Sequence, residues 1–399
     1  MISKESYHII SDNKKAVTEL NIEELKTAVL VHLYYEEQVD IYKIYLENIP
    51  FFIDIIIISP KDKILERFPS SRFQKVKKKN RGRDSSALLV AAKNIVDHYE
   101  YICFIHDKKE KRLTEKEYVD LWSKNLWSNM LQSPIYIYNI LELFASDDKI
   151  GMLVPLPPHK REMGVWLHSS WGENYCHTKR LADELNIATN ISDENPPFTY
   201  STVFWARTKT LKKLYLKDWQ YIDFPDEPMR DDGEINHAVE RVLQYVVEDA
   251  GYKVGIALSS SYAASFIEQL HYEMNALWDQ METTLGIRNY KGLDNYNLRR
   301  EKIKNFEKKG LDIYLYGGGK VGKECLKLCL SLDIVPKGII VTKMENILDK
   351  KIDGIPIMSI NNVRLEQNMG IIVSVGSKKQ AEIVEELEKR NFYQYLLFE

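Results

Sequence analysis

The stretch FIDIIIIS at residues 52–59 points to the fold class, because a run this rich in isoleucine is typical of a central strand covered on both faces of a sheet. Residues 27–35 predict a strand before it, followed by a helix over 37–48. A helix over 86–98 leads into a third apolar run at 101–105. Strands and helices that alternate in this order indicate a parallel α/β sheet with right-handed crossovers.

A second α/β unit is predicted at the end of the chain. A strand over 312–316 leads into a glycine-rich turn and a helix over 321–332, and further strands and a helix follow. Residues 266–309 predict a helical connector, since their charged blocks leave little apolar surface for a core. The sequence therefore predicts a first α/β domain over 1–265, the connector, and a small three-layer α/β domain over 310–399.

The charge balance limits the classes of partner. Lys and Arg total 55 against 58 Asp and Glu, which gives a net charge of -3 and argues against nucleic acid as a partner. Residues 1–10 lack the apolar core of a signal peptide, and the most apolar stretch, 50–60, is about half the length that spans a bilayer. We expect a cytoplasmic protein whose contact with a membrane, if any, is peripheral.

Two polar stretches follow predicted strands and are candidates for binding a nucleotide diphosphate. In parallel sheets, ligands bind beyond the carboxyl ends of the strands. Arginine provides a fork of donors for phosphate oxygens, and lysine provides a point charge. The Lys-rich run at 75–79 also permits the alternative of a solvated basic patch. The candidate residues are Asn80, Arg81, Arg83, Asp84, His106, Lys108 and Lys109.

An acidic loop that leads into a helix provides candidate catalytic residues. Asp232 lies close to the predicted helix start, where the helix dipole favours its ionised form. His237 and Arg241 share one face of that helix with Glu240. A carboxylate kept ionised can act as the general base for a hydroxyl nucleophile. Ordinary N-capping by Asp232 is an equal alternative on spacing alone.

Two further motifs have both a functional and a structural explanation. Trp205 and Arg207, in the segment Phe-Trp-Ala-Arg, suit an aromatic-lined acceptor site, although such side chains more often fill cores. Gly317, Gly319 and Gly322 form G-x-G-x-x-G between a strand and a helix, which is the context of a dinucleotide site. The acidic residue expected on the ribose is missing, so tight packing of the strand against the helix is the favoured explanation.

Residues 29–254 resemble the rhamnan synthesis protein F family, bacterial glycosyltransferases of rhamnose-containing cell-wall and O-antigen polysaccharides. The stretches that carry the resemblance are Asn80-Arg81-Gly82-Arg83-Asp84, His106-x-Lys108-Lys109, Trp122 with Asn125-Leu126, Phe204-Trp205-Ala206-Arg207, and Asp232-Gly233 with His237-Ala238-x-Glu240-Arg241. The resemblance implies a GT-A-like fold, dTDP-rhamnose as donor, and a lipid-linked or free saccharide as acceptor. It also implies that Asp232 is the base, with the nucleotide-binding candidates on the donor side.

The chain departs from the usual GT-A pattern at the metal site. Enzymes of that fold usually carry Asp-x-Asp, which holds a divalent metal, Mg or Mn, on the diphosphate. Residues 106–109 read His-Asp-Lys-Lys instead, and a single carboxylate is a poor site for a hard cation. We therefore make no firm prediction of a cofactor, and we expect Lys108 or Lys109 to neutralise the leaving diphosphate. The C-terminal unit is similar to the small Rossmann-like domain appended to enzymes of polysaccharide synthesis.

Two other functions stay open on the sequence alone. The first is an NAD-dependent oxidoreductase or epimerase built on the C-terminal glycine-rich turn. The second is a non-catalytic scaffold of a polysaccharide assembly complex. Turnover of a sugar nucleotide, measured with and without metal, would distinguish a glycosyltransferase from both alternatives.

Overall fold

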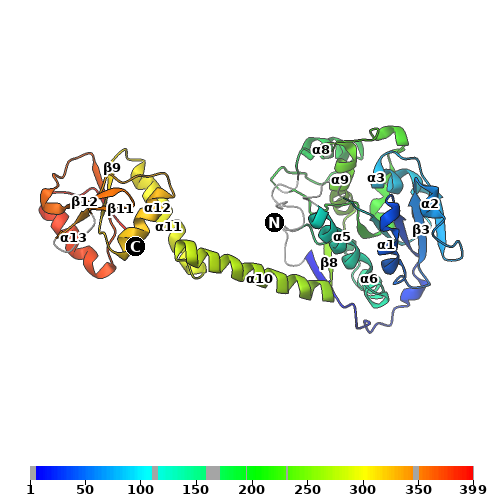
Figure 1. Cartoon of the computed structure of the whole chain (residues 1–399). Helices are drawn as coiled ribbons and strands as arrows, with labels where there is room; N and C mark the ends of the chain where they lie inside the picture. The colour runs from blue at the N-terminus through cyan, green and yellow to red at the C-terminus, as the bar shows by residue number, and fades with distance from the viewer. Residues whose placement is uncertain are drawn as a thin grey trace. The chain divides into compact units, whose positions relative to one another are not determined.

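A computed structural model of the chain describes residues 6–109, 116–158, 171–194, 196–230, 232–344 and 350–398. The chain forms two compact units, residues 1–269 and 270–399 (Figure 1). Both units consist of a sheet that is covered by helices, so the predicted α/β class is confirmed.

The described strands of the first unit form one sheet in the order β1-β8-β6-β7-β5-β2-β3-β4. Their bounds are β1 Tyr7–Ile10, β2 Thr27–His32, β3 Asp54–Ser59, β4 Phe73–Lys77, β5 Tyr101–His106, β6 Ile150–Pro155, β7 Phe204–Arg207 and β8 Lys253–Ser259. The pairs are parallel except those of β7, which runs antiparallel to both β5 and β6. The parallel sheet expected around residues 52–59 is therefore present, and β7 is inserted into it as a short antiparallel strand.

Helices cover both faces of this sheet (Figure 1). On one face, Tyr42 and Trp127 share a buried cluster with Val31 of β2. On the other face, Leu88 and Val239 pack with the neighbouring β2 residue, Leu30. The two faces thus follow the alternation of side chains along a strand. The first set of helices is α1 Val39–Leu46, α5 Lys116–Leu131 and α6 Pro134–Ser146. The second set is α3 Arg83–Ser86, the π-helix η4 Ala87–Ala91, α4 Lys93–Val96, α8 Tyr175–Glu184 and α9 Ile235–Asp249.

Short helices fill the connections of the first unit. They are η2 Ile22–Glu24, η3 Glu36–Gln38, α2 Asp62–Leu65, η6 Thr208–Tyr215 and η7 Tyr221–Asp223. The single helix that the sequence predicts over 86–98 is interrupted in the structure, because the π-helical turn η4 separates α3 from α4. The helix α3 begins at Arg83, directly after Gly82 in the segment that carries the candidate nucleotide-binding residues.

The second unit has its own sheet in the order β11-β12-β10-β9-β13-β14. Its strands are β9 Asp312–Tyr316, β10 Gly338–Val341, β11 Lys351–Ile352, β12 Ile355–Ser359, β13 Met369–Val373 and β14 Tyr395–Leu397. The short β11 is antiparallel to β12, and the other pairs are parallel. The helices α12 Lys320–Leu330 and α13 Ser377–Lys389 pack on it, and η8 Ile360–Asn362 follows β12.

The region predicted as a connector divides into two helices with different surroundings. These are α10 Ser260–Leu285 and α11 Tyr290–Glu307. In α11, Ile303 and Phe306 are 1% and 5% exposed and belong to the same core cluster as Leu315 of β9. The two apolar residues are three positions apart, so they lie on one face of α11. In the sequence they stand among charged residues, which is why the pattern did not indicate a buried face. The helix α11 is therefore part of the second unit. A fragment that begins at residue 310 would lack the core side chains of Ile303 and Phe306.

The glycine-rich turn after β9 is explained in part by close packing. Gly317 has φ +125°. A Cβ at Gly322 would lie 1.9 Å from the carbonyl oxygen of Gly317, so α12 approaches the end of β9 more closely than any other residue allows. A Cβ at Gly319 meets nothing within 4 Å.

We expect Gly322→Ala to lower the free energy of unfolding of the second unit by about 1–3 kcal/mol, because α12 must move away from the strand. Gly319→Ala is the matched control and is expected to stay within about 0.5 kcal/mol of the wild type. Thermal and urea unfolding of the full chain measure both. Equal stability of the two variants would show that packing does not require Gly322.

Candidate functional site

Buried titratable side chains collect at the carboxyl edge of the first sheet. His32 ends β2 and His106 ends β5, and the two residues are partners across the parallel pair. Lys78 comes directly after β4. These three residues are only 4%, 5% and 5% exposed. Together with Asp84 and Lys108 they form what we call the edge cluster. Perturbed titratable groups at this edge of a parallel sheet indicate a ligand site.

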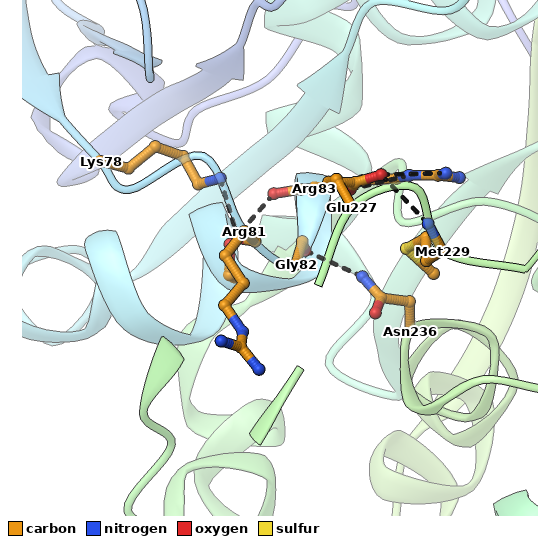
Figure 2. Close-up of polar contacts among 8 residues, drawn as sticks. Lys78, Arg81, Gly82, Arg83, Glu227, Met229 and Asn236 are labelled. Atoms are coloured by element: carbon orange, nitrogen blue, oxygen red, sulfur yellow. Dashed lines mark hydrogen bonds and ion pairs between the residues drawn. The ribbon is translucent and has the colours of Figure 1, made fainter. Parts of the chain in front are cut away.

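A glycine turn brings the Asn-Arg-Gly-Arg-Asp segment to this edge. Gly82 has φ +71°, and a Cβ at this position would lie 2.5 Å from Cγ of Phe224. Its carbonyl oxygen accepts a 2.8 Å hydrogen bond from Nδ2 of Asn236 at the start of α9 (Figure 2). The backbone conformation and the close approach both require glycine here. The turn is therefore fixed between the loop over 224–229 and α9.

The two arginines of this turn are held by that loop. Arg81 donates from Nε to the carbonyl oxygen of Phe224 at 2.6 Å and pairs with Asp226 at 2.7 Å. Figure 2 shows its guanidinium group pointing away from Lys78. Arg83 lies against Glu227, with 3.2 Å between Nε and Oε1. Arg81 thus acts in the structure as an anchor of the loop. The side chain of Arg83 is 44% exposed, so solvent reaches its guanidinium group while it stays paired with Glu227.

Asn80 precedes this turn and has an exposed side chain. Asn80, Arg81 and Arg83 are neighbours in the sequence, but their side chains have different surroundings in the structure.

His106 is arranged as a neutral base beside a carboxylate. Its Nδ1 lies 2.9 Å from the carbonyl oxygen of Asp107, which only accepts, so Nδ1 carries the proton in the neutral ring. Its Nε2 then has a free lone pair and lies 4.0 Å from Oδ2 of Asp84. Burial lowers the pKa of His106 below its usual 6.5, so the ring is neutral at pH 7. A proton taken up at Nε2 would be stabilised by the adjacent carboxylate of Asp84.

Asp84 stays ionised although the protein buries it. Burial alone would raise its pKa, but the His106 ring, the Thr202 hydroxyl and Lys108 together hold it below the usual range. His32, in contrast, is kept in its neutral form. Burial, followed by the charge of Lys78, lowers the pKa of His32 well below 6.5.

Lys78 is a buried ammonium group with few partners. Its Nζ donates to the carbonyl oxygen of Arg81 at 3.3 Å (Figure 2). Burial lowers its pKa to about 8, although the carboxylates of Asp84 and Glu227 act to raise it. A cation that is desolvated in this way gains from an anionic ligand, because the ligand replaces the lost hydration.

The lysines that follow β5 differ in their surroundings. The ammonium group of Lys108 lies 3.7 Å from the ring centroid of Trp122, a cation–π contact. Burial lowers the pKa of Lys108, and the carboxylates of Glu240 and Asp84 oppose that shift. Lys109 is exposed and pairs with Glu37. Of the two lysines, Lys108 belongs to the edge cluster and Lys109 lies outside it.

Asp107 has a structural task in this arrangement. Its Oδ2 accepts hydrogen bonds from the backbone amides of Tyr34 at 2.7 Å and Tyr35 at 2.8 Å. Burial raises its pKa to about 7, against the effect of these bonds. Among the described residues, no group of three or more His, Cys, Asp or Glu side chains is placed to hold a metal ion.

Asp232 lies at the start of α9 and is engaged by a neighbouring turn. Its Oδ2 accepts from the backbone amide of Glu173 at 2.9 Å, and its Oδ1 accepts from Nδ2 of Asn174 at 2.5 Å. Asn174 in turn accepts from the amide of Gly233 at 3.1 Å. Burial raises the pKa of Asp232, but these hydrogen bonds outweigh burial and lower it. The carboxylate is ionised, as the sequence predicts, but its lone pairs are used to hold the 172–174 turn.

The two other residues of the helix motif lie on α9. His237 accepts at Nδ1 from the amide of Glu234 at 3.2 Å and thereby closes a capping box. Arg241 is 8% exposed and bonds to Glu240 at 2.6 Å, with its guanidinium carbon 4.9 Å from the ring centroid of Tyr200. Glu240 and Arg241 act on the pKa of Lys108 in opposite directions, since the carboxylate raises it and the guanidinium group lowers it.

The structure does not support an acceptor site at Trp205 and Arg207. Trp205 is 0% exposed and donates from Nε1 to the carbonyl oxygen of Met130 at 2.9 Å. Arg207 is 8% exposed and donates to Ile150 and Tyr101, both at 2.8 Å. Both side chains lie in β7 and join the inserted strand to its surroundings. The core explanation, which the sequence left open, is the one that fits.

Several buried polar atoms around the edge cluster have no partner within the described ranges. They are His32 Nε2, Ser85 Oγ, Trp122 Nε1 and Asn236 Oδ1. Each belongs to the cluster or adjoins it, since Ser85 follows Asp84, Trp122 contacts Lys108, and Asn236 bonds to Gly82. Buried polar groups are nearly always bonded in folded proteins. Other unpaired atoms lie elsewhere in the unit, such as Trp171 Nε1 and Thr178 Oγ1, but a polar ligand at this edge would supply partners to the four that adjoin the cluster.

The buried charges and unpaired polar atoms thus lie beyond the carboxyl ends of parallel strands, where α/β sheets bind their ligands. The family model described as rhamnan synthesis protein F matches residues 3–252. The chain belongs to this family, whose name refers to the synthesis of a polysaccharide.

The chain is also similar to the uncharacterized protein WxcX of two strains of Xanthomonas campestris pv. campestris. In both cases 178 residues are 26% identical and cover 44% of this chain. The match covers 24% of each relative, so the chain spans about a quarter of their length. Across the described ranges, no helix is both long and apolar enough to cross a bilayer.

Proposed function

We propose that the chain is a glycosyltransferase of bacterial cell-surface polysaccharide synthesis, with a GT-A-like catalytic domain in the first unit. It transfers rhamnose, or a related sugar, from a nucleotide-sugar donor such as dTDP-rhamnose to a hydroxyl of a lipid-linked or free saccharide. The observation that carries the proposal is the edge cluster itself, which combines desolvated cations, a neutral base and unpaired polar atoms. Membership of the rhamnan synthesis protein F family supports the sugar.

The cations of the edge cluster suit the diphosphate of the donor. Lys78 and Lys108 are both desolvated, and Arg83 is exposed beside them. Arg83 pairs with Glu227, and the carboxylate of Asp84 acts on both lysines, together with Glu227 at Lys78 and Glu240 at Lys108. Burial is the main cause of the lowered pKa of both lysines, so an anion bound near them would replace the hydration that they lose. The same cations stabilise the negative charge that grows on the leaving diphosphate.

His106 is the base that this geometry favours. The acceptor hydroxyl attacks the anomeric carbon, a new C–O bond forms, and the bond from that carbon to the phosphate oxygen breaks. The hydroxyl proton moves to Nε2 of His106, whose other nitrogen is fixed by the carbonyl of Asp107 at 2.9 Å. Asp84 stabilises the resulting imidazolium ion. Asp232, the base that the resemblance implies, is the rival assignment.

Two assays test the proposed function. Purified full-length chain is incubated with dTDP-rhamnose and a rhamnose-terminated oligosaccharide, and the release of dTDP and the mass of the product are followed. Calorimetry with dTDP measures binding separately from transfer. Binding without turnover on any sugar nucleotide would favour the scaffold alternative, and absence of both would remove the proposal.

The affinity for dTDP is expected to depend on pH through Lys78. Without ligand, Lys78 has a pKa of about 8 in the folded chain, and a bound anion favours its protonated form. Below pH 8 the ammonium is already charged, so affinity stays level down to about pH 7. Above pH 8 binding must take up a proton, and the dissociation constant is expected to rise by up to about tenfold per pH unit. Calorimetry between about pH 7 and 9.5 measures this slope. A flat profile would remove Lys78 from the site.

Transfer is expected to survive EDTA at least in part. Lysines follow β5, whereas enzymes of the proposed GT-A-like fold usually carry Asp-x-Asp for a metal, and Asp107 is bound to two backbone amides. The measurement is the rate of transfer with EDTA and after addition of Mg²⁺ or Mn²⁺. Complete loss with EDTA and recovery with metal would make Asp107 a ligand candidate and contradict the role given to Lys108.

The oxidoreductase alternative depends on NAD binding by the second unit. Close packing accounts for Gly317 and Gly322, as described above, and Thr342 and Lys343 follow β10 where an acidic residue would grip the ribose. Calorimetry of the full chain with NAD and NADP tests this alternative. Low-micromolar affinity for either cofactor would restore it.

A further inference from the structure

The long helix α10 carries an apolar seam that is not part of either core. The seam consists of Ile267, Leu270, Met274, Leu277 and Met281. The intervals between these residues alternate between three and four, which is the spacing of the a and d positions of a coiled coil. This spacing is specific, because a helix that packs on a globular core shows a broader and less regular apolar face.

Four of the five seam residues are exposed although they are apolar, and Met281 is half-buried. Ile267, Leu270, Met274 and Leu277 are 60%, 36%, 51% and 57% exposed. The preceding residue Phe266 packs against the core of the first unit, so the free seam begins where that packing ends. An exposed apolar stripe of regular spacing indicates an interaction surface.

The charge of α10 decides between a lipid surface and a protein partner. Residues 260–285 contain four acidic residues and no Lys or Arg. Helices that lie on membranes carry basic residues on the polar face, since the lipid surface is negative. The charge of α10 therefore disfavours a lipid surface.

We infer that α10 pairs with α10 of a second copy of this chain to form a two-stranded coiled coil. A second copy offers the same 3–4 spacing, which knobs-into-holes packing requires of the partner helix. With Ile267, Met274 and Met281 as a positions, Glu268 and Glu282 are b positions and Asp279 is an f position, so these three carboxylates lie away from the seam. In a parallel pair, Glu273 at a g position faces Trp278 of the other copy at an e position, so no like charges meet there.

The length of the seam sets the strength of the pairing. From residue 267 to residue 281 the helix rises about 21 Å, which corresponds to two heptads. An interface of this length belongs to the small class, so we expect a dimer with a dissociation constant in the micromolar range. The acidic outer face also predicts that pairing strengthens with salt, because salt screens the repulsion between the two copies.

Sedimentation equilibrium of the full chain from about 1 to 200 µM tests this inference. The weight-average mass is expected to rise from 46.7 kDa toward twice that value. Leu277→Glu is expected to weaken the dimer by about 30-fold or more, because it removes an apolar side chain from each helix and places a charge in the seam. Asn275→Glu is the matched control, since it adds the same charge two residues away at a b position, and the added repulsion at this exposed site is expected to weaken the dimer by less than about threefold.

Three results would overturn the inference. The first is a monomer at every concentration, and the second is a Leu277→Glu variant that dimerises as tightly as the wild type. The third is co-sedimentation of the wild type with phosphatidylglycerol vesicles that is lost in Leu277→Glu, which would assign the seam to lipid. Circular dichroism checks the fold of each variant, and Met274→Gln provides a milder seam variant if Leu277→Glu unfolds.

Discussion

Replacing His106 with glutamine is expected to lower the rate constant of transfer by about 10²- to 10⁴-fold while the affinity for dTDP changes little. The side-chain amide of glutamine approximates the size of the ring but takes up no proton at neutral pH. In the wild type, the rate should fall as pH decreases through the pKa of His106, which burial lowers below 6.5. Steady-state kinetics with saturating donor, together with calorimetry, separates the loss of rate from any loss of binding.

Asp232→Asn is the matched variant, because the same experiment decides between the two candidate bases. Asparagine retains an oxygen for the amide of Glu173, so the 172–174 turn is kept at reduced strength. We expect transfer to fall less than about tenfold. The opposite pattern, with Asp232→Asn losing a hundredfold or more and His106→Gln near the wild type, would make Asp232 the base, as the family resemblance implies.

The fold could be predicted from the sequence wherever one physical pattern dominated. The isoleucine run at 55–58 and the apolar run at 101–105 predicted central strands, and β3 and β5 are buried strands at those places. The short β7 was harder, because only four residues pair and its neighbours lie far away in the chain. Its orientation depends on tertiary pairing, which no local pattern encodes.

The candidate site was readable only in part. The segment 80–84 and His106 were identified because charged residues next to strand ends are conspicuous. His32 was missed, since the predicted strand ran on to Tyr35 and made this residue an interior one. The register across β2 and β5, which pairs His32 with His106, becomes visible only in the sheet. Lys78 was hidden in a lysine run that reads as a solvated surface.

Residues identified by type alone divided according to their burial. Asp84 and Lys108 face the same cluster, whereas Arg81 anchors a loop and Lys109 forms a surface pair. The charge of a side chain predicts what it can bind, but hydrogen bonds to backbone and neighbouring acids decide whether it is free to bind. Those bonds join residues about 140 positions apart, such as Arg81 and Phe224.

Lys78→Met is expected to change binding and stability in opposite directions. Burial lowers the pKa of Lys78 from 10.5 to about 8 in the folded chain. That shift corresponds to a cost of about 3 kcal/mol for keeping the ammonium charged, and the cost is present in full below pH 8 and fades as pH rises toward the pKa of the unfolded chain. Methionine has a similar length and no charge. We therefore expect the free energy of unfolding without ligand to rise by about 1–3 kcal/mol at pH 7, while dTDP binds about 100-fold more weakly.

Urea unfolding at pH 7 and calorimetry with dTDP provide the two measurements, and Lys77→Met is the matched control. Lys77 is the preceding residue, and its exposed ammonium pairs with Asp62 at 2.7 Å, so its removal should move stability by less than about 0.5 kcal/mol and leave dTDP binding within about threefold. A gain in stability together with a loss of affinity means that the chain carries an unfavourable buried charge for the sake of its ligand. If Lys78→Met instead lowers stability and leaves dTDP binding intact, the bond from Lys78 to the carbonyl of Arg81 is structural, and the diphosphate must be bound elsewhere on the sheet edge.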